Sequence, residues 1–214
     1  MLYFYFFKLL LMKNAISLLF LIMVCNISAQ DAYTKGIMGY QYEQNLKFHN
    51  KEVSPLSAKD LKNFSALHFY KIDEKFKITA KLVKEKEPII FEMQTTTSRK
   101  PLYIKYGTLT FTIDGKEQTL TIYQNKDFGR APQYKDYLFL PFTDKTSGIE
   151  SYGGGRYLDV LTTDENTDGT ITIDFNKSYN PYCAYNSSYS CPLTPKENTV
   201  SIALKAGVKV YKKH

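Results

Sequence analysis

The feature that most constrains the fold is an alternation of apolar and polar side chains that recurs along the chain. Residues 76–82 read FKITAKL, and Ile89, Phe91 and Met93 repeat the same spacing a few residues later. A period of two is typical of a β-strand with one buried face. The aromatic content of 15%, with 18 Tyr, 14 Phe and no Trp, favours strands as well, because flat, stiff side chains fit a pleated surface.

A β-hairpin is predicted over residues 108–123, where an Asp-Gly pair separates two alternating runs. A four-residue loop over 114–117 would place Phe111 opposite Leu120 and keep one face of the hairpin apolar. A two-residue loop would instead place Phe111 opposite Gln118. Because the buried face of a strand specifies its register, we expect the four-residue loop.

The rest of the chain also favours short strands. One short helix is expected near the N-terminus, over residues 58–64, because Ser57 is a suitable N-cap and Leu61 and Phe64 lie three apart. Nine or ten short strands and one helix indicate a mainly β fold, either a single-domain β-sandwich or a partly closed barrel. The further strand segments are residues 67–72, 137–140, 156–161, 170–175 and 200–205.

Residues 1–30 have the pattern of a secretory signal peptide, which leaves residues 31–214 as a single β-rich domain. Lys13 precedes a ten-residue apolar run, and small and polar residues follow that run. We therefore expect a secreted or periplasmic protein. Two alternatives for membrane attachment stay open: an uncleaved anchor that includes residues 1–11, and a lipid anchor on Cys25.

The charge pattern argues against a polyanionic partner. The formal net charge of +7 is mild, and basic residues are interleaved with acidic ones, as in the run KEKE at residues 84–87. Nucleic-acid binders gather Lys and Arg on one face or stripe, so we expect no nucleic-acid partner. The composition leaves the oligomeric state open.

The composition changes in a motif-dense part, residues 139–200. Three consecutive glycines precede Arg156, and six tyrosines occur from Tyr152 to Tyr189. The glycines permit tight turns and would deliver Arg156 to the start of a strand. Tyrosine offers both a flat apolar face and a hydroxyl group, which suits the binding of a small polar ligand.

Three stretches of this part resemble the signature of the domain-of-unknown-function family 1684 (DUF1684), a set of bacterial and archaeal proteins. They read PFTDKTSGIESYGGGRYL, DFNKSYNPYCAYN and CPLTPKENTV. The resemblance extends from about Leu46 to the C-terminus, which is most of the chain. It implies a family but no reaction, so a functional site has to be argued from the residues themselves.

We expect the motif-dense part to form a polar, tyrosine-lined pocket. The guanidinium of Arg156 is a planar fork of donors suited to a carboxylate, and its expected partners within the chain are Asp159 or Asp174. Pairing with Asp174 would make Arg156 a structural clamp, and this alternative stays open beside ligand binding. The predicted ligand-binding residues are Arg156, Tyr157, Asp174, Asn176, Asn180 and Tyr185.

Cys183 and Cys191 are the only thiols that remain once residues 1–30 are removed. In an oxidising compartment such a pair most simply forms a disulfide, which would hold the loop between them in shape. A reactive thiol and half of a metal site are the alternatives. We expect no metal, because the chain has only three histidines and no further cysteine pair to complete a tetrahedral site.

Familiar catalytic motifs are missing from the sequence. It has no G-x-S-x-G elbow, phosphate-binding loop or dinucleotide fingerprint, so no cofactor is expected. The function that we expect is a binding module for a small anionic or carbohydrate-like ligand. One alternative is a hydrolase that uses Asp174 or Glu150 as acid or base with Arg156, and another is a motif-dense part that is purely structural. Whether the protein is an enzyme stays open.

Overall fold

The computed structural model describes residues 30–127 and 134–212, and the chain divides into two compact units. The first unit is Met1–Gly39, of which the described residues 30–39 are helical. The predicted signal segment, except for its last residue, therefore lies outside the described residues. Within the part that is described, no helix combines the length and the apolar character that a membrane span requires.

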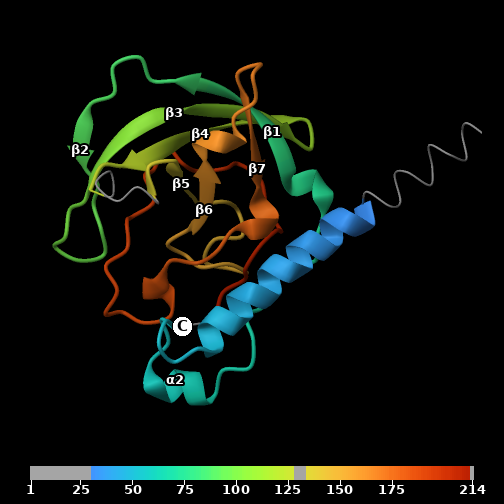
Figure 1. Ribbon diagram of the computed structural model, residues 1–214, viewed down its shortest axis with the longest axis vertical. Coiled ribbons are helices and arrows are strands. Elements are labelled where there is room, and N and C mark those ends of the chain that lie inside the picture. The colour runs from blue at the N-terminus through green and yellow to red at the C-terminus, as the bar shows by residue number, and fades with distance from the viewer. Residues whose placement is uncertain (1–29, 128–133, 213–214) are drawn as a thin grey trace, which may run out of the picture. The chain divides into compact units, whose positions relative to one another are not determined.

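The second unit, Tyr40–His214, is built around a seven-stranded sheet that curls into a half-barrel (Figure 1). The strand order is β6-β5-β4-β3-β1-β7, β2 pairs with β3, and all pairs are antiparallel. The prediction of a mainly β fold with a partly closed barrel is confirmed. The strands are β1 (Lys77–Lys84), β2 (Ile90–Glu92), β3 (Leu102–Ile113), β4 (Lys116–Asn125), β5 (Tyr137–Phe142), β6 (Arg156–Leu161) and β7 (Thr170–Asp174).

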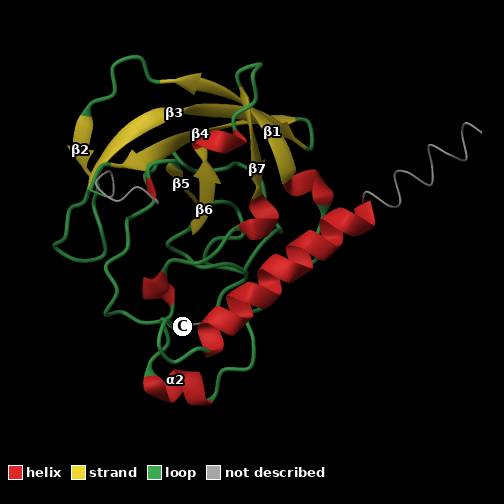
Figure 2. Cartoon of the chain, viewed as in Figure 1, coloured by secondary structure: helices red, strands yellow, loops and turns green. Residues whose placement is uncertain are grey.

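Short helices and turns connect the strands (Figure 2). The predicted helix is present as α2 (Ala58–Lys62), and the Ser57 hydroxyl caps it by accepting the amide N–H of Asp60 over 3.1 Å. Residues 40–49 are also helical, which the sequence analysis does not predict. The short 3-10 turns are η1 (Glu74–Phe76), η4 (Thr162–Asp164), η5 (Phe175–Lys177) and η6 (Tyr182–Ala184).

One face of the sheet packs the main hydrophobic core. The alternation predicted in the first strand is confirmed, because Ile78, Ala80 and Leu82 are buried while the intervening residues of β1 are exposed. Burial of each large aliphatic side chain contributes about 1.5–3 kcal/mol of transfer free energy, so this face stabilises the whole unit. From β5 and β6 the core receives Leu138, Leu140, Leu158 and Val160.

The predicted register of the β3–β4 hairpin is wrong. The loop has two residues, Asp114 and Gly115, with φ angles of 50° and 72°, as a type I′ turn requires. Phe111 therefore pairs with Gln118, and a shift of two residues leaves every side chain on its expected face. Gln118 is tolerated in this buried position because its side-chain oxygen accepts the Ser201 amide over 2.8 Å.

β2 is shorter and more exposed than the alternation predicts. It has only three residues, Ile90–Glu92, and it pairs with β3 alone. Met93 is buried as expected, but Ile89 is 80% exposed. Ile89 lies before the first paired residue, so no neighbouring strand covers it.

Two predicted strands are absent, and the described residues contain seven strands rather than nine or ten. In residues 67–72 only Phe69 makes an isolated bridge, to Val208. Gly207 has a φ of +70°, and this left-handed conformation interrupts the extended run beside the bridge. Residues 200–205 form no ladder either, although their apolar side chains are buried in the main core.

Arg156 holds this C-terminal segment against the sheet in place of a β-ladder. Its guanidinium is fully buried, lies 2.7 Å from the carboxylate of Asp144, and donates to the backbone carbonyl groups of Leu204, over 2.8 Å, and Ala206. Asp144 also accepts the amide N–H of Leu204 over 3.3 Å. The buried ion pair therefore satisfies the backbone groups of Leu204 and the carbonyl of Ala206, while Val200 and Ile202 bond the backbone of residues 143 and 145.

Replacement of Arg156 by Met should lower the free energy of unfolding by about 3–5 kcal/mol, because it leaves Asp144 as a buried charge without its partner. Urea denaturation followed by circular dichroism measures this change. The double variant Arg156→Met with Asp144→Leu removes both charges and should recover part of the loss. A single-variant effect below about 1 kcal/mol, the level typical of exposed ion pairs, would contradict the role of a buried clamp.

Candidate functional site

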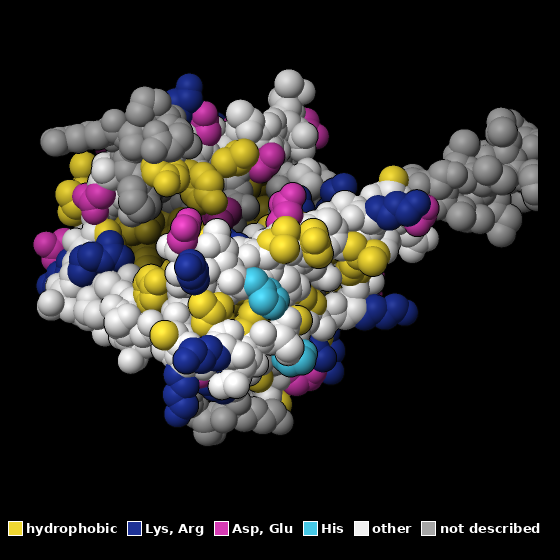
Figure 3. All heavy atoms as spheres, turned by 60° about the horizontal axis from the view of Figure 1, so that its bottom comes forward, with side chains coloured by type: hydrophobic (Ala, Val, Ile, Leu, Met, Phe, Trp, Pro, Cys, Tyr) yellow, Lys and Arg dark blue, Asp and Glu magenta, His cyan; other side chains and the backbone are white. Residues whose placement is uncertain are grey.

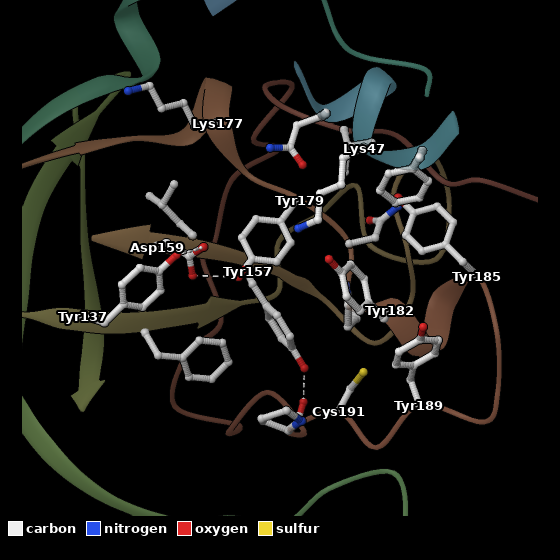
Figure 4. A pocket seen from close by; sticks show the side chains of 18 of the residues that line it. Lys47, Tyr137, Tyr157, Asp159, Lys177, Tyr179, Tyr182, Tyr185, Tyr189 and Cys191 are labelled. Carbon is white, nitrogen blue, oxygen red and sulfur yellow. Dashed lines mark hydrogen bonds between the residues drawn. The ribbon is translucent and has the colours of Figure 1, made fainter. Parts of the chain in front are cut away.

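A cavity of about 690 Å³ lies against β5 and β6 (Figure 4). These two strands pair directly, with Phe139 opposite Asp159 and Pro141 opposite Tyr157. Successive side chains of a strand point to opposite faces, so Tyr137, Phe139, Tyr157 and Asp159 line the cavity. Their neighbours Leu138, Leu140 and Val160 pack the core instead. The same two strands therefore serve the core with one face and the cavity with the other.

The helical residues 40–49 form a second wall of the cavity. Tyr40, Gln44, Lys47 and Phe48 line it, and spacings of four, seven and eight residues place them on one helix face. The Tyr40 hydroxyl donates to the backbone carbonyl of Lys177 over 2.8 Å and so fixes this wall to η5.

The third wall is the loop that contains η6 and continues to Pro192. It is fixed to β6, because the backbone amide and carbonyl groups of Tyr157 bond those of Tyr179 over 2.8 and 2.9 Å. The Tyr157 hydroxyl also donates to the backbone carbonyl of Pro192. Both ends of the loop are therefore fixed to β6.

Aromatic rings dominate the lining. Several rings meet edge to face, such as Phe139 and Tyr157 at 4.7 Å and Tyr182 and Tyr189 at 5.2 Å between centroids. Burial raises the pKa of Tyr157 and of Tyr185 far above the usual tyrosine range, so both remain neutral. The aromatic lining residues are Tyr40, Phe48, Phe69, Tyr103, Tyr134, Tyr137, Phe139, Tyr157, Tyr179, Tyr182, Tyr185 and Tyr189.

Asp159 is the only acidic residue among the described residues that line the cavity. Its carboxylate accepts the hydroxyl groups of Tyr179, over 2.6 Å, and Tyr137, over 2.7 Å. Burial raises the pKa of Asp159, and the two tyrosine hydrogen bonds and the charge of Lys47 oppose this rise. The cavity thus contains a desolvated carboxylate that two neutral phenols hold in place.

Three basic residues also line the cavity: Lys47, Arg99 and Lys177. Arg99 is occupied, because its guanidinium donates to the Ser190 hydroxyl over 3.1 Å and to the Ser190 carbonyl over 2.9 Å. The Lys47 ammonium lies 5.4 Å from the centre of the Tyr182 ring. On the face shown in Figure 3, basic and acidic side chains are interspersed and form no single-sign patch.

Three of the predicted ligand-binding residues meet at this cavity: Tyr157, Asn180 and Tyr185. Asn180 is buried, and its amide group donates to the Lys209 carbonyl over 2.9 Å and to the Tyr185 hydroxyl over 3.2 Å. Its side-chain oxygen accepts no hydrogen bond from the described residues. A buried acceptor without a donor is costly, so this oxygen is a candidate contact for a ligand.

The other three predicted residues, Arg156, Asp174 and Asn176, are not among the lining residues. The prediction that Arg156 pairs with Asp159 or Asp174 is wrong. Arg156 pairs with Asp144, and both side chains are fully buried in the core. One Asp174 oxygen accepts the backbone and side-chain N–H groups of Asn176, each over 3.0 Å, and so caps η5. These contacts correspond to the structural alternative rather than to ligand binding.

The hydrolase alternative needs an acid beside Arg156 in a cleft. Glu150, its other candidate acid, lies 2.9 Å from the ammonium group of Lys205 and is not among the lining residues.

Within the described part of the chain, no group of three or more His, Cys, Asp or Glu residues is arranged to hold a metal ion.

The expected disulfide is not formed in the structure, where Cys183 and Cys191 are free thiols. They are nevertheless in contact, because the sulfur of Cys191 accepts the backbone amide of Cys183 over 3.2 Å. Cys191 lines the cavity, whereas Cys183 belongs to η6 behind it. Cys183 and Cys191 therefore lie next to each other, as predicted, but no disulfide bond joins them.

The sheet and the cavity define a β half-barrel protein with an aromatic-lined cavity. The DUF1684 family model, described as a protein of unknown function, matches residues 62–209, and the chain belongs to this family. The chain is also similar to an uncharacterized protein from Haloarcula marismortui, known from a solution NMR structure. The two share 29% identity and a TM-score of 0.67, over 87% of this chain and 99% of the other. A comparison with curated proteins gives no match.

The sequence analysis missed the wall formed by residues 40–49 and the part that Asp159 plays. A signal for the first is the helical spacing of Tyr40, Gln44 and Phe48. A signal for the second is the strand period, because Asp159 lies two residues after Tyr157 and shares its face.

The thiol pair gives a pH-dependent prediction. Hydrogen bonds from the Cys191 thiol and then the Tyr152 hydroxyl lower the pKa of Cys183 to about 7, although burial opposes them. The thiolate is the reactive form, so alkylation of Cys183 in reduced protein should rise with pH and reach half of its maximal rate near pH 7. Peptide mass spectrometry after timed iodoacetamide labelling measures this profile.

The variant Cys191→Ala is the matched control for that profile. It removes the main donor, so the midpoint for Cys183 should move to higher pH. A wild-type midpoint at the ordinary thiol pKa of about 8.5, or an identical midpoint in the variant, would contradict the proposed hydrogen bond.

Proposed function

We propose that this protein binds a small, ring-shaped, carbohydrate-like ligand in the tyrosine-lined cavity. The observation that carries the proposal is the lining itself, with nine tyrosines and three phenylalanines around a volume of about 690 Å³. Ligand cavities typically have about 300–1,000 Å³, with apolar walls and a few polar groups that fix orientation. Tyrosine rings can stack on a sugar ring while Asp159 and Asn180 accept its hydroxyl groups.

Between the two ligand classes expected from the sequence, the carbohydrate-like class has more support than the anionic class. Arg156, the residue expected to bind an anion, is buried in the core and paired with Asp144. Arg99 is bonded to Ser190, and the one lining carboxylate, Asp159, would repel an anion. We do not extend the proposal to hydrolysis, because Asp174, Glu150 and Arg156 all lie outside the lining.

Replacement of Tyr182 by Ala should weaken ligand binding about threefold to tenfold, since an aromatic contact contributes about 0.5–1.5 kcal/mol beyond its buried area. The ligand is first selected from a panel of mono- and disaccharides by thermal shift, and its affinity is then measured by isothermal titration calorimetry. Tyr42→Ala is the matched control, because Tyr42 is 65% exposed and lies outside the cavity.

Two results would refute the proposed function. One is a panel in which no compound stabilises the wild-type protein. The other is a ligand whose affinity falls equally in Tyr182→Ala and Tyr42→Ala, since that pattern would place its binding outside the cavity.

We further propose, from residues 1–30, that the protein is exported to the periplasm or secreted. In such an oxidising compartment the neighbouring thiols of Cys183 and Cys191 would form the disulfide. Mass spectrometry of the exported protein should find an N-terminus at Gln30 or Asp31 and a mass lower than that of the reduced form by two hydrogen atoms. Retention of residues 1–29, or labelling of both thiols without reduction, would contradict this proposal.

A further inference from the structure

Asp159 has no ionic partner in the described structure. The two groups that contact its carboxylate are the neutral hydroxyl groups of Tyr137 and Tyr179. No described Lys, Arg or His side chain lies within ion-pair distance of it. A half-buried carboxylate that has only neutral hydrogen-bond partners would be stabilised further by a positive group at this position.

The rings around Asp159 offer the complementary half of a cation site. Figure 4 shows Tyr137 on one side of the carboxylate and Tyr179 and Tyr157 on the other. Tyr157 and Tyr179 meet edge to face with 5.9 Å between centroids, so their faces are turned in different directions. The face of an aromatic ring attracts a cation through its quadrupole, most strongly where water is excluded.

The protein already places one ammonium group on a ring of this cavity. Lys47 Nζ lies 5.4 Å from the centre of the Tyr182 ring, within the range of a cation–π interaction. Lys47 and Asp159 both line the cavity, yet they form no ion pair. The lining therefore accommodates a positive charge, and this charge acts on the carboxylate only from a distance.

We propose that the cavity recognises an organic ammonium group of its ligand, which docks on the Asp159 carboxylate between the rings of Tyr137 and Tyr179. This inference rests on the proposed function and specifies the ligand class as a small amine-bearing molecule, for example an amino sugar. A neutral polyol could donate hydrogen bonds to the same oxygen atoms. Only a cation also supplies the countercharge to the carboxylate.

Ammonium binding should depend on pH in a defined direction. The groups that face Asp159 are Tyr137 of β5, Tyr179 after η5, and Tyr40 and Lys47 of the helical wall. The pKa values of the three tyrosines are raised, so these residues stay neutral as Asp159 titrates. Burial raises the pKa of Asp159 in the free protein, and a bound cation favours the ionised form. Affinity for an ammonium group whose own charge does not titrate therefore increases as pH rises through that pKa and is constant above it.

Choline is the probe for this test, because its quaternary ammonium group carries a charge that does not titrate. The matched control ligand is 3,3-dimethyl-1-butanol (dimethylbutanol), in which a carbon atom replaces the charged nitrogen. It is uncharged and has nearly the same shape. Wild-type protein is titrated with each compound, and the tyrosine ring resonances are followed by NMR across a range of pH. We expect choline to bind at least about tenfold more tightly than dimethylbutanol, because only choline carries a charge that can pair with the Asp159 carboxylate and be attracted by the aromatic rings.

Two variants assign the effect to Asp159. Asp159→Asn keeps the size of the side chain and removes its charge, so the preference for choline and its pH dependence should both disappear. Tyr137→Phe keeps the ring and removes a hydrogen bond that lowers the pKa of Asp159, so the pH midpoint of choline binding should shift upward. Tyr137 is 37% exposed, which makes this variant a usable measurement if Asp159→Asn does not fold.

Equal affinity of the wild-type protein for choline and dimethylbutanol would overturn this inference and leave the proposed function intact. An Asp159→Asn variant that retains the preference, or a midpoint that does not move in Tyr137→Phe, would overturn it too. Failure of choline, dimethylbutanol and every sugar of the panel to bind would overturn the inference and the proposed function together.

Discussion

The structure depends on the use of both faces of β5 and β6. A strand alternates its side chains, so the residues that stabilise the core and those that line the cavity come from the same short segments. Leu138 and Tyr137 are direct neighbours in the chain, yet one packs the core and the other borders the cavity. The cavity wall is therefore attached directly to the core, which favours preorganised tyrosine rings for the proposed ligand.

The fold class could be predicted from the sequence because period-two patterns and turn residues are local signals. The pattern determined the faces of β1, β3 and β4, but not the pairing of Phe111, since a two-residue shift preserves every face. Residues 200–205 show what a local sequence pattern cannot predict. Their apolar alternation marks burial correctly, but their backbone partners are the Arg156 side chain and irregular segments that no local pattern reveals.

The candidate site could be predicted only in part. The abundance of tyrosine in one segment pointed to Tyr157 and Tyr185, and both line the cavity. Arg156 was misassigned, since a buried structural ion pair and a ligand-binding arginine look alike in sequence. The role of Asp159 depends on strand pairing and on the tyrosines of distant segments. That arrangement exists only after the chain has folded.

The buried clamp of Arg156 also has a consequence for the order of folding. The carbonyl groups that it bonds belong to residues 48 and 50 positions farther along the chain. Contacts of such long separation form slowly, because the intervening loop must close first. β6 therefore precedes the partners of its guanidinium group in the chain, and the clamp can form only after residues 204 and 206 have been synthesised.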